Sequence, residues 1–482
     1  MNRRGFLTAA AGLALKPALA ASQDLSALTL KQASELLRSK TASPVDLTQA
    51  CLKRIERYNS TLNAFITVTG DQALRTARVM EAEQRHGKWR GPLHGIPIAL
   101  KDNIDTAGIR TSAASELFEN RVPSEDAEVV RKLKAAGAVI LGKLNLHEFA
   151  YGGTSDVTYF GEVHNPWALD HISGGSSGGS AAATAADLCF GSLGTDTAGS
   201  VRIPSSYCGV VGFKPTYGRV SLRGVIPLSW TLDHVGPICK TVEDSALILA
   251  ATAGYDQLDP ASVDVPVPDY TRAFKMETSK LRLGVPRSPF FENLDPEVAQ
   301  TVEAAIAALR KISNHFTEPT LPPTFPLMLT ITGAEAYAYH AKSIVESPEK
   351  YQPFTRDRIV QLAADMKAPA YAAALRRTNL LRREITKIFS SVDLLITPTM
   401  PHPAESFAQS KTFDAVGLQN TSPFDVLGLP TISVPCGFAS SGLPIGLQIS
   451  GAPFAESTVL ALAHAYERET EWHQRHPSLI PA

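Results

Sequence analysis

Two serine-bearing turns in the chain could carry nucleophilic chemistry, and the first is the Gly174–Ser180 segment, GGSSGGS. Its four glycines permit backbone dihedrals and close approaches that residues with a Cβ resist. Because the apolar run 181–186 follows, we expect a serine hydroxyl near a helix N-terminus, where backbone amides favour negative charge. A plain Gly/Ser turn is an equal alternative for this segment alone. No Gly-Lys-Ser/Thr follows, so a phosphate-binding loop is disfavoured.

The second turn is the Gly194–Pro204 segment, GTDTAGSVRIP. The small residues before Ser200 let several backbone N–H groups converge beside its hydroxyl. Such convergence is what stabilises an oxyanion in acyl transfer. Asp196 and Arg202 bracket the turn, and we interpret them as a buried structural ion pair without a chemical part.

Lys101 is the candidate base. It directly follows the apolar run 95–100, GIPIAL, which is typical of a buried strand. A lysine at such a place is more often an interface or surface residue. If it is desolvated, however, its pKa falls, and a neutral amine can then act as a base near pH 7.

A competing interpretation comes from the same glycines, because Gly174–Gly178 also fits G-x-S-x-G, the nucleophile elbow of α/β-hydrolases. That fold requires an apolar strand directly before the motif, and residues 165–172 make a poor strand. It also requires a downstream histidine, and the chain has several, so this second criterion does not discriminate.

The elements that must position these residues alternate between strands and helices, which favours an α/β layered fold. Two helices are expected within 28–58, the second starting at Ser43–Pro44, and a third over 71–86. Residues 256–280 are expected to form a surface excursion, and residues 295–390 are expected to be mostly helical. One large sheet is expected, completed by the C-terminal third. Strands are predicted over 95–100, 138–141, 392–397, 431–435 and 447–449. A helix capped by Ser124 is predicted between the first two strands, over 125–136.

Composition excludes several classes of protein. The chain has 482 residues, 19% of them charged, and a net charge of -1, so no global field attracts nucleic acid or an acidic membrane. Five scattered cysteines do not form a disulfide framework. There is no HExxH motif and no nucleotide-binding motif, so neither a metal nor an organic cofactor is predicted.

The first twenty residues, MNRRGFLTAAAGLALKPALA, are typical of an export signal. A basic start, a short apolar stretch and a small-x-small end predict a cleavable signal peptide over 1–20, and Arg3-Arg4 are similar to a twin-arginine signal. The expected location is therefore periplasmic or secreted. A cytoplasmic protein with a fortuitous basic start is the alternative. No other segment is long and apolar enough to span a membrane.

Taken together, these segments resemble the amidase signature family. The resemblance covers most of the chain in the right order, and its serine-glycine core is highly specific. The matching stretches are GIPIALKDNID (95–105), LNLHEFAYG (144–152), NPWALDHISGGSSGGSAAATAA (165–186), GTDTAGSVRIPSSYCGVVGFKPTYGRVS (194–221), DLLITPTMP (393–401), LGLPTISVPCG (427–437) and GLPIGLQISGAPFAE (442–456).

The resemblance implies an α/β fold, in detail an α/β/α arrangement around a mixed sheet of about eleven strands. A single domain over 24–478 would hold a signature core at 90–240 and a variable helical region at 255–390. It also implies a Ser–cis-Ser–Lys triad without metal or cofactor. The implied triad is Lys101 as base, Ser176 as bridge and Ser200 as nucleophile; the implied oxyanion and substrate contacts are the amides of Thr197, Ala198, Gly199 and Ser200, together with Ser176 and the Ala150 carbonyl. Ala198 stands where many members have glycine.

The function implied is hydrolysis of a small-molecule linear amide to an acid plus ammonia or amine, without nucleic acid as a ligand. A serine esterase or acyl transferase is one alternative. The glutamine-amidase subunit of a tRNA amidotransferase is another, and the export signal opposes it. An inert binding protein on the same scaffold is a third. A homodimer is compatible with the sequence, and Tyr337, Tyr339 and Arg376 are candidate pocket residues of the variable region.

Overall fold

The computed structural model describes residues 24–364, 366–410 and 416–479. Its centre is a mixed sheet of eleven strands in the order β1-β3-β2-β6-β8-β7-β12-β13-β11-β9-β10, as predicted. Strands from both halves of the chain meet where β7 pairs with β12. The bounds are β1 Phe65–Val68, β2 Pro97–Lys101, β3 Val139–Leu144, β6 Gly191–Asp196, β7 Val211–Lys214, β8 His234–Cys239, β9 Arg282–Gly284, β10 His315–Thr317, β11 Leu394–Pro398, β12 Thr431–Phe438 and β13 Pro444–Gly451.

Helices cover both faces of this sheet, so the α/β/α layering is confirmed. A Cβ at Gly194 of β6 would meet Ser177 beside α5 (Gly178–Ala185), whereas a Cβ at Gly191 would meet Ile248 of α7 (Val242–Thr252). These glycines are three residues apart in one strand and so point to opposite faces. Likewise β13 packs against α6 (Arg202–Cys208) on one face and α15 (Glu456–Thr470) on the other.

The N-terminal helices follow the predicted pattern. They are α1 (Leu30–Arg38), α2 (Pro44–Leu62) and α3 (Gly70–Arg85). Ser43 caps α2 by accepting a hydrogen bond from the Asp46 N–H, with proline at the first helical position. The predicted cap at Ser124 is wrong: α4 spans Glu128–Ala135, and its N-cap residue is Ala127. Residues 124–127 instead form a connection in which Ala127 donates its N–H to the Asp105 carbonyl.

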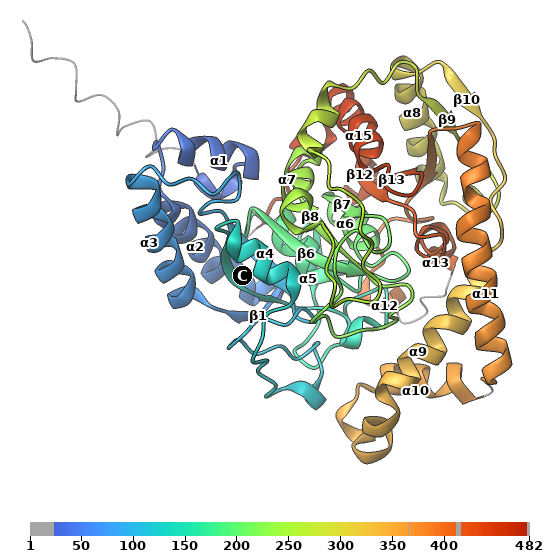
Figure 1. Cartoon of the computed structure of the whole chain (residues 1–482), viewed down its shortest axis with the longest axis horizontal. Coiled ribbons are helices and arrows are strands. Elements are labelled where there is room, and N and C mark those ends of the chain that lie inside the picture. Colours follow the sequence, from blue (N-terminus) through green and yellow to red (C-terminus); the bar gives the residue numbers. More distant parts are fainter. Residues whose placement is uncertain (1–23, 365, 411–415, 480–482) are drawn as a thin grey trace, which may run out of the picture.

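The variable region is mostly helical, as expected, and its residues 325–364 project at the lower right of Figure 1. Its long helices are α8 (Pro296–Ile312), α9 (Phe325–Glu346), α10 (Pro353–Ala364) and α11 (Ala368–Glu384). Strand β10 interrupts this helical run and extends the sheet edge. The short helices α12 (Phe407–Ser410), α13 (Val416–Thr421) and α14 (Pro423–Val426) lead into β12.

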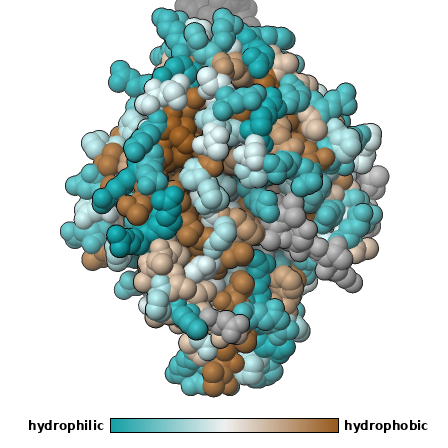
Figure 2. Space-filling view, turned by 90° about the vertical axis from the view of Figure 1, so that its right-hand side faces the viewer, coloured by the Kyte–Doolittle hydropathy of each residue, from teal (hydrophilic) through white to brown (hydrophobic). Residues whose placement is uncertain are grey.

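Apolar side chains are exposed on this projection. Val345 at the end of α9 is 74% exposed and Phe354 at the start of α10 is 49% exposed. Figure 2, which looks onto the right-hand side of Figure 1, shows hydrophobic residues gathered at the lower tip of the molecule. Exposed apolar groups that lie together are typical of an interaction surface.

One segment forms a strand that the sequence did not predict. Residues Ala168–Ile172 form β5, which pairs with β4 (His164–Asn165) in a separate two-stranded sheet. Neither belongs to the central sheet, so the apolar sheet strand that an α/β-hydrolase needs before its elbow is still missing.

The predicted signal peptide, residues 1–20, lies outside the described residues. Among the helices that the structure describes, none is long and apolar enough to cross a membrane. All five cysteines are buried and free.

Candidate active site

Lys101 ends strand β2 with its side chain completely buried. Its Nζ lies 2.7 Å from the Ser176 Oγ and 2.8 Å from the Thr195 Oγ1. Burial lowers the pKa of Lys101 to about 7, and the negative charges of Asp233 and Asp196 oppose that fall without cancelling it. An amine with this pKa is substantially neutral near pH 7, so it can accept a proton from a hydroxyl. The alternative of a surface lysine is therefore excluded.

Ser176 lies in the turn between β5 and α5, and the peptide bond that precedes it, Gly175–Ser176, is cis. Its carbonyl oxygen accepts hydrogen bonds from the His147 N–H at 3.1 Å and from the Ser155 hydroxyl at 3.2 Å. A Cβ at Gly175 would lie 2.8 Å from the Thr154 amide nitrogen, so the turn is packed too closely for another side chain there. Backbone contacts on both sides thus hold the Ser176 hydroxyl against the amine of Lys101.

Ser200 closes the turn between β6 and α6. Its carbonyl accepts a hydrogen bond from the Ser177 N–H at 3.2 Å, which brings the two serine turns together. Ser200 is 8% exposed, whereas Lys101 and Ser176 are completely buried. No hydrogen bond joins the Ser176 and Ser200 hydroxyls in this structure. Of the three side chains, the Ser200 hydroxyl is therefore the one that solvent or a ligand reaches first.

The Asp196 carboxylate shapes the turn that leads to Ser200. It accepts hydrogen bonds from the Gly199 N–H at 2.6 Å and the Val201 N–H at 3.1 Å. Gly199 has a φ of +131°, and a Cβ there would collide with the Thr421 side chain, so only glycine fits. The Gly199 amide, expected to face an oxyanion, is instead committed to Asp196.

The remaining amides of the turn have no such partner. Among the described hydrogen bonds, none uses the N–H groups of Thr197, Ala198 or Ser200. Successive backbone N–H groups left without an acceptor beside a serine form a concavity suited to an anion.

The predicted ion pair between Asp196 and Arg202 is confirmed. The Arg202 Nε donates to Asp196 at 2.9 Å and its Nη2 to Asp425 at 2.6 Å, with all three side chains completely buried. Although burial alone would raise the pKa of Asp196, the Arg202 guanidinium holds it well below its ordinary value. The turn is thus locked by a charged network with no part open to a ligand.

The loop that carries Ala150 runs in a left-handed conformation, with φ of 50° at Phe149 and 60° at Ala150. The Phe149 ring packs edge-on against His340 of α9, their centroids 4.4 Å apart. The Arg358 guanidinium of α10 lies 4.9 Å from the centre of the Tyr151 ring. The variable helical region therefore borders the loop directly.

Arg358 forms no ion pair with any carboxylate in the described parts of the chain, as is also true of other arginines such as Arg110 and Arg382. The three candidate pocket residues of the variable region are less informative. Tyr337 and Tyr339 are 37% and 38% exposed, and Arg376 is also exposed. Neither Tyr337 nor Arg376 has a contact that ties it to the serine turns.

Three polar residues near Lys101 and the Ser200 turn were not predicted from the sequence: Thr195, Asn103 and Asp233. The Thr195 Oγ1 also accepts a hydrogen bond from the Asn103 Nδ2 at 3.1 Å. Asp233 accepts one from the Thr197 hydroxyl at 2.5 Å. Thr195 faces Lys101 only because β2 and β6 are parallel neighbours, and a sequence does not reveal that pairing. In the sequence, only the position of Thr195 within the GTDTAGS segment pointed to a place in the site.

No histidine takes the place that an α/β-hydrolase triad requires. All twelve histidines are described, and none of their rings is hydrogen-bonded to the hydroxyl of Ser176 or Ser200. The ring of His147, whose backbone N–H bonds the Ser176 carbonyl, is held by Thr154 and Ser155. Within the described residues no group of three or more His, Cys, Asp or Glu side chains could hold a metal ion.

Comparison with known proteins gives consistent matches. The Amidase family model matches residues 46–460. The A subunit of the glutamyl-tRNA(Gln) amidotransferase of Moorella thermoacetica is 42% identical over 94% of this chain and 98% of its own. The structure of the same type of subunit from Thermotoga maritima superposes with a TM-score of 0.79 at 33% identity, covering 93% of this chain and 96% of that one.

A solved peptide amidase in complex with the competitive inhibitor chymostatin gives a TM-score of 0.83 at 31% identity, covering 94% and 99% of the two chains. Free amidases and amidotransferase subunits therefore share this fold and its sheet.

Proposed function

Because the chain belongs to the amidase signature family, and so to enzymes that cleave amide C–N bonds, we propose that it hydrolyses a carboxylic amide through an acyl-enzyme on Ser200. The observation that carries the proposal is the 2.7 Å contact between the buried amine of Lys101 and the Ser176 hydroxyl. A serine hydroxyl is a weak nucleophile at neutral pH and needs such a base.

In the proposed reaction, neutral Lys101 takes the proton of Ser176 as Ser176 takes that of Ser200. The Ser200 Oγ then attacks the amide carbonyl carbon. This step requires the two serine hydroxyls to come within hydrogen-bonding distance once substrate is bound, since apo geometry is often looser than that of the complex. The charge that develops on the carbonyl oxygen is stabilised by the free amides of the Ser200 turn.

Collapse of the tetrahedral intermediate breaks the C–N bond. Ser176 donates the proton that the leaving nitrogen needs, and ammonia or an amine departs. Water then attacks the acyl-enzyme with the same residues acting in reverse, which releases the acid and restores Ser200. No step requires a metal or an organic cofactor.

For the substrate, two observations favour the glutamine-amidase alternative over a general linear-amide hydrolase. Two curated relatives that are each 42% identical to this chain carry the name of the amidotransferase A subunit. In addition, the unpaired guanidinium of Arg358 beside the Ala150 loop suits a carboxylate, which arginine binds in a bidentate fashion. We therefore propose a primary amide that also bears a carboxylate, of which glutamine is the reference compound.

Ammonia release from L-glutamine and from butyramide by the purified full-length chain tests this. Arg358→Ala should lower kcat/KM for glutamine by about 10- to 100-fold, mainly through KM, because a charge-assisted bond is lost. Butyramide turnover should stay unchanged. Arg356→Ala is the matched control, because Arg356 in the same helix is paired with Asp357. Equal losses on both amides would refute the carboxylate subsite, and turnover of neither would refute amide hydrolysis.

Two opposed proposals concern whether the chain acts with partner subunits or alone. The exposed apolar tip of α9 and α10 offers a surface for a partner protein, in keeping with the relatives' designation as one subunit of an amidotransferase. Export through residues 1–20 would instead favour a chain working alone outside the cytoplasm. Cell fractionation separates these proposals: Arg3→Lys combined with Arg4→Lys should retain an exported chain in the cytoplasm and leave a cytoplasmic chain unmoved.

A further inference from the structure

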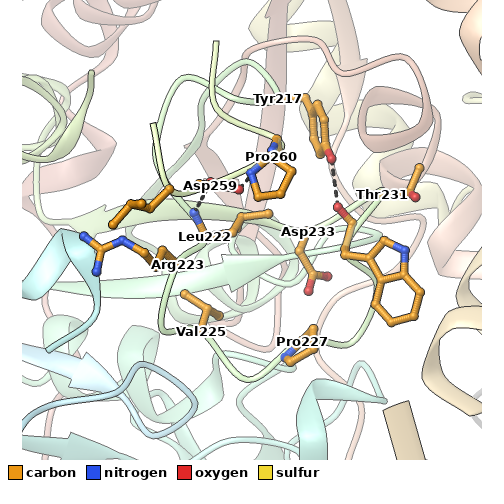
Figure 3. A pocket seen from close by; sticks show the side chains of 12 residues that line it. Tyr217, Leu222, Arg223, Val225, Pro227, Thr231, Asp233, Asp259 and Pro260 are labelled. Carbon is orange, nitrogen blue, oxygen red and sulfur yellow. Dashed lines mark hydrogen bonds between the residues drawn. The ribbon is translucent and has the colours of Figure 1, made fainter. Parts of the chain in front are cut away.

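A second cavity lies apart from the relay. It measures about 430 Å³, and none of its lining residues belongs to the two serine turns, to Lys101 or to the Ala150 loop. Figure 3 shows Tyr217, Leu222 and Pro260 on its wall, and Trp230 also lines it. In Figure 3 the Asp233 carboxylate points towards Pro227, and both residues line the cavity. A mostly apolar cavity of this size with a few polar groups is typical of a small-molecule site.

The charges that face the cavity are negative. Asp233 is only 4% exposed, and Asp259 also lines the wall. Neither carboxylate forms an ion pair with a basic side chain of the described chain. The one cation on the wall, Arg223, is already neutralised, because its guanidinium donates to Asp256 at 2.8 Å and also forms an ion pair with Glu128. Burial without a cationic partner raises the pKa of Asp233 to about 7.

The walls are held in place before any ligand arrives. The Tyr217 hydroxyl donates to the Trp230 carbonyl at 2.8 Å. The buried Glu335 carboxylate accepts hydrogen bonds from the Ser229 hydroxyl at 2.5 Å and the Thr231 N–H at 3.1 Å, which fixes the segment on both sides of Trp230. A preformed site loses little conformational entropy when it binds.

We propose that this cavity is a second binding site, for an organic primary amine. Its ammonium group would pair with the Asp233 carboxylate, and its apolar part would lie against Trp230 and Tyr217. Aromatic faces and a buried carboxylate together select a cation that carries a hydrocarbon body. An anion of the same shape is repelled by Asp233 and Asp259, and a neutral analogue supplies no cation to the Asp233 carboxylate, which the structure leaves with hydrogen bonds from Thr197, Leu228 and Ser229 alone.

The site is linked to the reaction centre through one hydrogen bond. The Asp233 Oδ1 accepts the Thr197 hydroxyl at 2.5 Å, and Thr197 begins the turn that ends at Ser200. The inference does not depend on the proposed substrate, because the cavity lining includes none of Lys101, Ser176 and Ser200, although the charge of Asp233 acts on Lys101.

Calorimetric titration with 2-phenylethylamine tests the site directly, on full-length enzyme whose nucleophile has been blocked by a serine-directed inhibitor. We expect saturable binding of one amine per chain, and no binding of 3-phenylpropionate. Leu258 at the rim is 67% exposed, so it can be exchanged without disturbing the core. Leu258→Lys should weaken binding by about fivefold through repulsion, whereas Leu258→Glu should not weaken it.

Several results would overturn the proposal. These are the absence of saturable amine binding on the blocked enzyme, equal binding of 2-phenylethanol, and equal affinities of the lysine and glutamate variants. Amine binding that disappears when the nucleophile is blocked would place the ligand in the reaction centre instead. The two variants should hydrolyse amide at the wild-type rate when no amine is present, which separates this test from that of the hydrolysis itself.

Discussion

Two completely buried lysines end strands of the same sheet, Lys101 in β2 and Lys214 in β7, and β6 and β8 lie between these strands. Burial lowers the pKa of both to about 7. Their surroundings differ. The amine of Lys101 meets the hydroxyls of Ser176 and Thr195. That of Lys214 donates to the Leu429 carbonyl at 2.6 Å and the Pro215 carbonyl at 3.2 Å, and lies 3.2 Å from the His234 ring.

The difference teaches that a lowered pKa alone does not make a catalytic base. A carbonyl oxygen can hold an amine but has no proton to give it, whereas a hydroxyl can pass one on. Lys101 therefore stands at the start of a proton path, and Lys214 ties β7 to the segment before β12. The predictions below test this contrast.

The largest effect is expected for the base itself. Lys101→Met keeps the length of the buried side chain but removes the amine, so amide turnover should fall by about 10⁴-fold. Steady-state ammonia release measures the loss, and circular dichroism and the urea-unfolding midpoint check the fold. A folded variant with activity near wild type would exclude Lys101 as the base.

A large loss of stability, rather than of chemistry, is expected from the ion network behind the Ser200 turn. Arg202→Met leaves Asp196 and Asp425 buried without their cation, which should cost about 3–5 kcal/mol of unfolding free energy. Urea unfolding measures it. Arg356→Met, at a partly exposed pair, should cost less than about 1 kcal/mol. Equal midpoints for the two variants would show that the buried network does not hold the turn.

The smallest effect on rate is expected for the second lysine. Lys214→Met should leave kcat within about threefold of wild type, because no hydroxyl of the relay contacts it. It should lower the unfolding free energy by about 1–3 kcal/mol, since the Leu429 carbonyl loses its donor. A rate loss like that of Lys101→Met, in a folded protein, would break the contrast between the two lysines.

Much of this site could be predicted from the sequence because its parts are local. The glycines around Ser176 and the small residues before Ser200 mark tight turns by their composition alone. The GIPIAL run marks a buried strand, although a lysine at the end of such a strand is more often at the surface, so the run alone did not predict that Lys101 is buried. Helix α2 was recognisable from Ser43 and Pro44, whose capping chemistry lies within four residues.

What could not be predicted depends on residues that are distant in sequence. The Gly199 amide is taken by Asp196, and only the folded turn shows that competition. Thr195 reaches Lys101 across the pairing of β2 with β6. Residues 168–172 lack an apolar pattern because their strand pairs within a small exterior hairpin, where no core selects one.

The pH dependence of Ser200 acylation tests the central claim most directly. A fluorophosphonate would be reacted with wild-type enzyme between pH 5 and 10, with the adduct located by peptide mapping. Because Lys101 must be unprotonated and its pKa lies at about 7, the rate should rise from pH 6 to 8, reach half its maximum near 7 and then level off, with the adduct on Ser200. An adduct on Ser176, or a rate that still climbs towards pH 10 as for an ordinary lysine, would contradict the account.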